Sequence, residues 1–171
     1  TYLGRDKKHL FQKVLPIEKA DTSKLHFPMW ASEKFDGVFC CALMDDDGEV
    51  HICSRTGEEY LSMEHLKPFL KVHPYWFNYL DVATILILFE AYIPGQKQNV
   101  VSGACRDTKN QHPEIVAMVH TFVMDGRAAL TKNVDAEETS VYRNVEHKLV
   151  YSLEEAKKMA ESIIDRGGEG L

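Results

Sequence analysis

The sequence predicts an α+β fold, built mostly from antiparallel sheets with flanking helices. A strand pattern at 38–44, the turn Asp-Asp-Asp-Gly and a second strand pattern at 49–55 together predict a hairpin. An apolar run at 85–93 has the length of a buried strand. Ser152 and Glu155 form a capping box ahead of an amphipathic helix pattern at 153–166. Hairpins mixed with a few helices favour antiparallel sheets over a βαβ repeat.

The remaining elements are shorter. The pattern at 59–70 predicts a short helix, and Pro68 and Pro74 then break this pattern, because proline interrupts helical hydrogen bonding. Pro113 is typical of a first helical residue and predicts a helix at 113–120. Residues 121–124 predict a further strand, followed by an Asp-Gly turn.

Composition indicates one globular domain over residues 1–171. The chain has 171 residues, of which 44% are hydrophobic, enough for a core. Apolar runs stay far below 18 residues and the N-terminal residues are polar, so we expect neither a membrane span nor a signal peptide. The four cysteines form no C-x-x-C pair, which favours reduced thiols in a cytoplasmic protein. We expect a monomer.

The charge balance limits the kinds of ligand. A net charge of -6 argues against a dedicated nucleic-acid-binding module, which usually has a basic surface. Arg106 and Lys109 form a local basic group and are candidates for contacts with phosphate or DNA. Neither glycine-rich phosphate-loop pattern is present, so a nucleotide would bind by another scheme.

Lys34 is the leading candidate for a catalytic residue. It precedes Phe35 and the turn dipeptide Asp36-Gly37, so it is predicted to project from the end of a strand. A lysine that is desolvated in a pocket, or placed beside another cation, loses its proton more easily and becomes a nucleophile. The alternative interpretation is an ordinary lysine in a surface turn.

Three further residues complete a candidate site. Glu90 closes the buried strand, Arg55 ends the second hairpin strand, and Glu169 follows the C-terminal helix. Each of them, taken alone, also fits a solvent-facing residue in a loop or at a strand end. Together with Lys34 they suit nucleotidyl transfer, in which an amine attacks the α-phosphate while arginine and carboxylates hold nucleotide and Mg²⁺.

This order of residues resembles the covalent nucleotidyltransferases, which are the ATP-dependent DNA ligases, RNA ligases and mRNA capping enzymes. The resemblance covers 32–171 and rests on five segments: Lys34-Phe35-Asp36-Gly37 (motif I), Ser54-Arg55-Thr56-Gly57, Leu88-Phe89-Glu90-Ala91 (motif III), 122–126 (motif IIIa) and Glu169-Gly170-Leu171 (start of motif IV).

The resemblance implies the adenylation domain of a nucleotidyltransferase, with an ATP-grasp-like fold. Lys34 would carry AMP through a phosphoramide bond. AMP would then pass to a 5′-phosphate and leave when a 3′-hydroxyl attacks. The implied nucleotide-binding residues are Glu33, Arg55, Glu90 and Phe122, with Phe122 stacked on adenine. The implied ligands of Mg²⁺ are Glu169 and Glu90.

The chain also departs from the family pattern. Phe39 stands where the family usually has arginine. Met124 stands where motif IIIa usually has an aromatic residue; Phe122 lies two residues earlier on the same predicted strand face. The later motifs and the oligonucleotide-binding domain have no counterpart in the sequence, so we expect an incomplete domain that is impaired in self-adenylation. The missing part is expected to be more basic.

Two features favour an ATP-dependent DNA ligase. Thirty-three residues precede Lys34, too few for the nicotinamide-recognising domain of NAD-dependent ligases. The segment 101–106, with Lys109, resembles a stretch of small bacteriophage-type DNA ligases. The expected partner is nicked double-stranded DNA, in a bacterial or phage-infected cytoplasm. An RNA ligase, a capping guanylyltransferase and a non-catalytic nucleotide- or DNA-binding relative stay open as alternatives.

Overall fold

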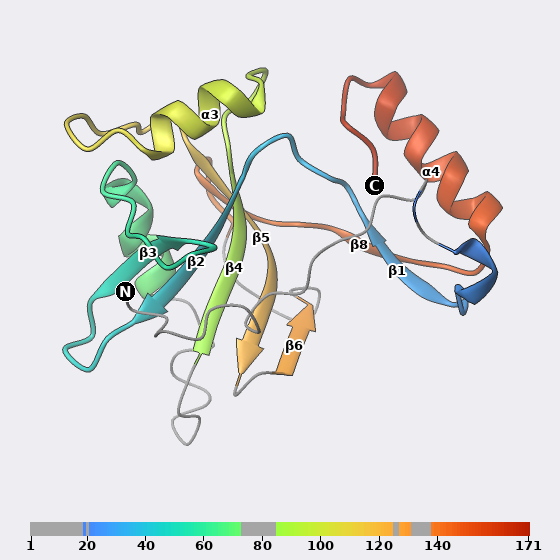
Figure 1. Ribbon diagram of the computed structural model, residues 1–171, viewed down its shortest axis with the longest axis horizontal. Helices are drawn as coiled ribbons and strands as arrows, with labels where there is room; N and C mark the ends of the chain where they lie inside the picture. The colour runs from blue at the N-terminus through green and yellow to red at the C-terminus, as the bar shows by residue number, and fades with distance from the viewer. Residues whose placement is uncertain (1–18, 20, 73–84, 125–126, 131–137) are drawn as a thin grey trace.

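A six-stranded sheet forms the centre of the molecule (Figure 1). The computed structural model describes residues 19, 21–72, 85–124, 127–130 and 138–171. The strands run in the order β3-β2-β4-β5-β6, and β7 pairs with β5. Their bounds are β2 Val38–Met44, β3 Val50–Ser54, β4 Ile85–Tyr92, β5 Val116–Met124, β6 Arg127–Leu130 and β7 Tyr142–Asn144. The β5–β7 pair is parallel and the other pairs of this sheet are antiparallel.

Strand β4 lies between β2 and β5, and its side chains alternate between the two faces of the sheet. Ile87 and Phe89 point into the main core. Leu86 and Leu88 belong to a smaller apolar cluster on the other face. Glu90 follows them in the alternation, and its register partners are Phe39 on β2 and Met118 on β5.

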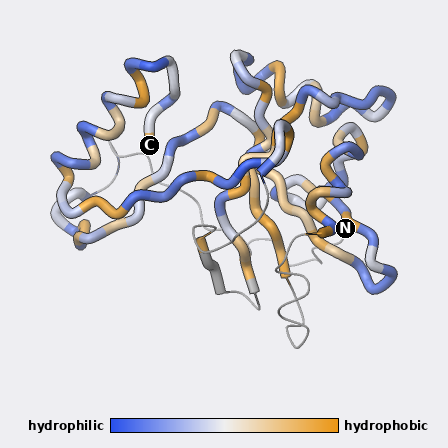
Figure 2. Tube along the Cα trace, turned by 180° about the vertical axis from the view of Figure 1, so that it is seen from behind, coloured by the Kyte–Doolittle hydropathy of each residue, from blue (hydrophilic) through white to orange (hydrophobic). Residues whose placement is uncertain are grey.

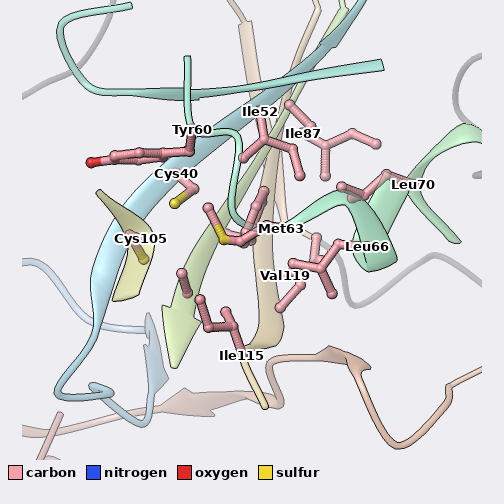
Figure 3. Close-up of a cluster of buried hydrophobic side chains, with 14 of the residues drawn as sticks. Cys40, Ile52, Tyr60, Met63, Leu66, Leu70, Ile87, Cys105, Ile115 and Val119 are labelled. Atoms are coloured by element: carbon pink, nitrogen blue, oxygen red, sulfur yellow. The ribbon is translucent and has the colours of Figure 1, made fainter. Parts of the chain in front are cut away.

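One face of this sheet carries the main core (Figure 3). A 3-10 turn at Glu64–Leu66 leads into α1 Lys67–Lys71, and α3 Gln98–Cys105 packs on β2 and β4. Figure 2 shows hydrophobic residues concentrated along the central strands. The completely buried members of this core include Cys40, Ile52, Met63, Leu66, Ile87, Phe89, Ile115 and Phe122.

A smaller unit lies beside this sheet. Strands β1 Met29–Ser32 and β8 His147–Val150 form an antiparallel pair, and α4 Leu153–Asp165 packs against β8. Figure 1 shows this unit on the right, with the C-terminus turned back toward the segment that links β1 to β2. The segment that follows β1 and the C-terminal segment that follows α4 therefore meet between the two sheets.

Several sequence predictions are confirmed. The α+β class with mostly antiparallel pairing holds for the described residues. The hairpin forms as β2 and β3, with a turn in which Gly48 has a φ of 77°. The C-terminal helix begins after Ser152, whose side chain accepts a hydrogen bond from the backbone N–H of Glu155. The Asp125-Gly126 turn lies outside the described residues.

Of the predicted helices, the one at 59–70 is confirmed in part and the one at 113–120 is wrong, and α3 was not predicted. Within the predicted helix at 59–70, Glu59 instead forms a β-bridge with Cys53 and helix starts only at Glu64; Pro68 lies in the first turn of α1, where its missing N–H costs nothing. The predicted helix at 113–120 is largely strand β5, because pairing with β4 and burial outweigh the Pro113 signal. Helix α3 was missed because its polar start, Gly103 and two valines give a weak helical pattern.

The four cysteines are free thiols, as their spacing predicted. Cys40, Cys41, Cys53 and Cys105 are free and buried. Among the residues that the structure describes, no helix has the length and apolar character needed to cross a membrane.

Candidate functional site

Lys34 lies in the segment between β1 and β2, where the two sheets meet. Its backbone N–H donates to the carbonyl oxygen of Gly170 at 2.8 Å, and its ammonium forms an ion pair with Glu169. The Lys34 side chain is 57% exposed. It is therefore not the desolvated lysine that the sequence suggested, because it projects from a connecting segment and is neutralised by a carboxylate rather than enclosed by apolar groups.

The turn after Lys34 is fixed on β4 and α3. The ring of Phe35 packs on Tyr92, with centroids 5.5 Å apart, and Asp36 Oδ2 accepts a hydrogen bond from the backbone N–H of Gln98 at 3.3 Å. A Cβ at Gly37 would collide with the carbonyl oxygen of Ala91 and lie 2.7 Å from Cγ of Glu90. The turn thus requires glycine at position 37, because its backbone lies directly against β4 beside Glu90.

The C-terminal segment is held against the same turn. After α4, Gly167 adopts a φ of 89°, and the chain reverses toward Lys34. Arg166 donates to Glu33 Oε2 at 3.0 Å, and a Cβ at Gly168 would lie 2.8 Å from Glu33 Oε1. Glu33, predicted to bind nucleotide, thus anchors the end of α4 in this structure and lines a groove of about 600 Å³ between α4 and β8.

Glu90 is the electrostatic centre of the site. Burial raises its pKa to about 7, and the charges of Glu169 and Asp36 act in the same direction. The cations Lys34 and Arg55 oppose this shift. The structure therefore brings together four predicted site residues, Lys34, Arg55, Glu90 and Glu169, which come from four separate segments. A carboxyl group whose pKa lies near neutrality is a feature of functional sites.

Arg55 lies over the ring of Phe39, the residue that departs from the family pattern. The guanidinium carbon is 4.8 Å from the ring centroid, within the range of a cation–π interaction. On β4, Glu90 is the register partner of Phe39. Both Phe39 and Arg55 therefore face the carboxylate at the end of β4. The sequence showed the departure at position 39, but not this contact.

Phe122, predicted to stack on adenine, lies in the main core. Its side chain has 0% exposure, so no ring face is open to a base in this structure. A β-bulge is the reason: Val119 pairs with Phe89 and Thr121 with Leu88, which leaves His120 as an extra residue on β5. The bulge changes which residues face each side of the sheet, and strict alternation along the sequence does not predict it.

The ring of His120 on β5 lies near Phe39, and no sequence pattern indicated this residue. Its centroid is 6.3 Å from that of Phe39, and a hydrogen bond of 2.8 Å joins its Nδ1 to Thr121 Oγ1. Burial, assisted by nearby His147, lowers the pKa of His120 to about 4. The imidazole is therefore neutral at pH 7.

Arg106 and Lys109 lie beyond the C-terminal end of α3 and are exposed. Arg106 lines a groove of about 320 Å³ whose other wall includes Ser54 and Thr56, the neighbours of Arg55 in sequence. The backbone N–H of Lys109 donates to Asp107. Arg106 thus lies across this groove from the neighbours of Arg55, and neither basic residue is among the charges that act on Glu90.

The carboxylates fit a magnesium ion only together with a substrate. Within the described part of the chain, no three histidine, cysteine, aspartate or glutamate side chains converge as a metal site. Glu169 is paired with Lys34, and Glu90 is within electrostatic range of both. Mg²⁺ is usually held by one or two protein carboxylates plus substrate phosphates, and Glu90 with Glu169 meets that requirement.

The fold is similar to solved structures of DNA ligases. A structure titled "Pmar-Lig_Pre." matches with a TM-score of 0.67 and 12% identity, over 87% of this chain and 38% of that one. The ATP-dependent DNA ligase of bacteriophage T7, solved in complex with ATP, matches with a TM-score of 0.52 and 16% identity, over 78% of this chain and 52% of that one. A Lig E DNA ligase matches with a TM-score of 0.50 and 16% identity, over 82% and 52% of the two chains.

Sequence comparison gave a different result. No protein-family model matches the chain, and no curated protein matches it either. The chain spans about two fifths to one half of the ligase structures that it resembles. At 12–16% identity these likenesses establish the fold, which is like that of a DNA ligase adenylation domain.

Proposed function

We propose that this chain is the nucleotide-binding part of an ATP-dependent polynucleotide ligase that seals nicks in duplex DNA. The convergence of Lys34, Glu90 and Glu169 supports this proposal most strongly. An amine beside two carboxylates, in a fold like that of ATP-dependent DNA ligases, suits the transfer of a nucleotide to lysine.

The proposed reaction has three steps. The Lys34 ammonium first loses its proton, and its nitrogen attacks the α-phosphorus of ATP; a P–N bond forms, a P–O bond breaks and pyrophosphate leaves. The 5′-phosphate of the nick then attacks the same phosphorus, which breaks the P–N bond and transfers AMP to the DNA. The 3′-hydroxyl finally attacks the 5′-phosphorus, the phosphodiester forms and AMP leaves.

The surrounding residues receive roles according to their positions. Arg55 and Glu90 would hold the ribose or the phosphates, one by donating and the other by accepting hydrogen bonds. His120 takes the place of Phe122 as the proposed contact for the base, because its ring lies near Phe39 whereas Phe122 is buried in the core. Glu33 acts indirectly in this proposal, through its ion pair with Arg166.

Glu90 and Glu169 are the residues that would hold Mg²⁺ together with the nucleotide phosphates. When bound, the ion would neutralise charge on the phosphates during transfer. It would also give Glu169 an alternative cationic partner to Lys34. The Lys34 side chain must be released from its ion pair with Glu169 before its amine can attack.

The DNA contact is proposed to be shared. Arg106 and Lys109 would meet the phosphate backbone from this chain, and a separate oligonucleotide-binding domain would supply most of the basic surface. The buried free thiols fit a reducing compartment, and the cytoplasm is the proposed location. We propose a monomer.

Covalent labelling tests the proposal. The protein is incubated with Mg²⁺ and ATP or GTP labelled at the α-phosphate, and is then denatured. We expect label from ATP that survives denaturation and disappears in Lys34→Ala. Lys148→Ala, which removes an exposed lysine of β8, should keep the label. Absence of label in the native chain would contradict the adenylation step and favour a non-catalytic binding relative.

The same assay separates the related enzymes. Label from GTP in preference to ATP would indicate a capping guanylyltransferase. If ATP is used, sealing of nicked RNA in preference to nicked DNA would indicate an RNA ligase. Sealing is measured with the complete protein, because the match covers only 38–52% of the ligase structures of similar fold.

A further inference from the structure

Phe39 and Arg55 are adjacent because of the strand register. Phe39 lies on β2, and its neighbour Cys40 pairs with Ser54 on β3, immediately before Arg55. The Arg55 guanidinium therefore leaves the end of β3 at the level of Phe39 and lies over its ring, 4.8 Å from the centroid. This contact follows from the backbone pairing and does not depend on a long loop.

The ring of Phe39 is well supported. It packs against the apolar cluster of Cys41, Leu86 and Leu88, and on another side it meets His120. A side chain held by several neighbours has few rotamers available. Phe39 is thus a fixed surface, whereas Arg55 is exposed and forms no ion pair with the described residues.

Stacking restricts Arg55 without using its hydrogen-bond donors. An exposed arginine has many accessible rotamers and loses that freedom when it binds a ligand. A carboxylate partner would order it but would occupy the N–H groups that recognise phosphate or hydroxyl groups. An aromatic ring contacts the flat face of the guanidinium and leaves its in-plane donors available for bidentate contacts.

The charge of the site also favours an apolar residue at position 39. Arg55 acts electrostatically on Glu90, and so does Lys34. An arginine at position 39 would be a third cation next to Arg55, and like charges repel. With phenylalanine at position 39, the repulsion is absent and Arg55 supplies the guanidinium that faces Glu90.

We propose that Phe39 is a positioning residue. Its ring holds Arg55 on the face of the sheet that carries Glu90, so that the N–H donors of Arg55 are directed at the nucleotide. This proposal rests on the proposed nucleotide-binding function, and it assigns to the Phe39–Arg55 pair the anion recognition that the family assigns to an arginine at position 39. Phe39 acts through Arg55 and makes no contact with the transferred phosphate.

The first experiment separates binding from chemistry. Phe39→Leu keeps an apolar side chain and removes the aromatic face, whereas Phe39→Tyr keeps that face. We expect Phe39→Leu to raise the KM for ATP in lysine labelling about 2- to 5-fold, with little change in the maximal rate. Phe39→Tyr should keep the KM of the wild type. Leu43→Val, farther along β2 in the same apolar cluster, should leave the KM unchanged.

The second measurement tests whether the effect passes through Arg55. In an Arg55→Ala background, Phe39→Leu should have no further effect on the KM, because the group that it positions is absent. Additive effects of the two substitutions would overturn the proposal. So would a wild-type KM in Phe39→Leu, or a loss in Phe39→Tyr as large as that in Phe39→Leu.

Equilibrium binding of ATP keeps this test distinct from the test of ligase chemistry. If the wild-type chain binds ATP but is never labelled, the ligase proposal fails, and the positioning role is decided by whether Phe39→Leu weakens ATP binding 2- to 5-fold. NMR supplies a structural readout: the Arg55 Hδ resonances should be shifted upfield by the ring and lose that shift in Phe39→Leu. An unshifted Arg55 in the wild type, or equal ATP affinity in both proteins, would overturn the proposal.

Discussion

The ammonium of Lys34 and the carboxylate of Glu169 form an ion pair across the junction of the two sheets. Lys34 follows β1, and Glu169 follows α4. The backbone bond from Lys34 to Gly170 and the Arg166–Glu33 pair hold these two segments together. The proposed nucleophile and a proposed metal ligand therefore lie in contact before a nucleotide arrives.

Glu169→Gln tests the role of this carboxylate. We expect lysine labelling to slow about 100-fold, because a preorganised charge is lost near the phosphates. The free energy of unfolding should change by less than about 1 kcal/mol, because both partners are substantially exposed. Glu161→Gln, an exposed residue of α4, is the matched control. Wild-type labelling in Glu169→Gln would remove Glu169 from the proposed site.

Gly37→Ala should destabilise the protein strongly. Its Cβ would meet the carbonyl oxygen of Ala91 and lie 2.7 Å from Glu90 Cγ, and strand backbone cannot move aside cheaply. We expect a loss of about 2–4 kcal/mol in urea unfolding. Gly103→Ala in α3 is the control: its Cβ meets nothing within 4 Å, and the higher helix propensity should stabilise by about 0.5–1 kcal/mol. Equal effects would contradict the close packing at Gly37.

The site residues could be found from sequence where a local pattern determines their position. Lys34 and Arg55 flank predicted strands, and Glu90 ends an apolar run, so their positions at strand ends follow from strand periodicity. Their convergence depends on β4 pairing with β2, which brings Glu90 opposite Phe39. That pairing joins residues far apart in sequence, and the family resemblance supplied what periodicity could not.

Other features depend on tertiary context that the sequence does not contain. The bulge at His120 moved Phe122 into the core, because alternation assumes an unbroken ladder. The exposure of Lys34 depends on where the segment between two sheets lies. Strand β5 overrode the Pro113 helix signal because Val116 and Val119 pair with β4 and are buried. The intrinsic preference of a short segment for helix or strand is energetically weaker than strand pairing and burial.

Glu90 should make stability depend on pH. Burial raises its pKa from 4.5 to about 7, so its contribution to stability is present below pH 4.5 and is lost as the pH rises through 7. Glu90→Gln removes this ionisation. We expect the variant to gain up to about 2 kcal/mol relative to wild type between pH 4.5 and pH 8, measured by urea unfolding. A difference between the two proteins that does not change with pH would contradict the raised pKa.

Protonated His51 should raise the free energy of unfolding at slightly acidic pH. Burial opposes its charge, but hydrogen bonds to Asp45 and Glu59, at 2.8 and 2.9 Å, outweigh burial and raise its pKa above 6.5. Its contribution is therefore full below pH 6.5 and is lost as the pH rises through the folded-state pKa. We expect His51→Gln to cost about 1 kcal/mol at pH 5.5 and less at pH 8.5. His26→Gln, at an exposed site, is the control. An NMR titration of His51 with a midpoint below 6.5 would contradict this prediction.

His120 and Phe122 should separate base stacking from core packing. His120→Ala should weaken ATP binding about tenfold, because base stacking on a ring is worth about 1–3 kcal/mol, and His120→Phe should restore the affinity. Phe122→Leu should instead lower the free energy of unfolding by about 1–2 kcal/mol and leave ATP affinity unchanged, since the ring is wholly buried in the core. Both quantities are measured on each variant, by equilibrium ATP titration and urea unfolding. Loss of ATP affinity in a folded Phe122→Leu protein, with full affinity in His120→Ala, would return the stacking role to Phe122.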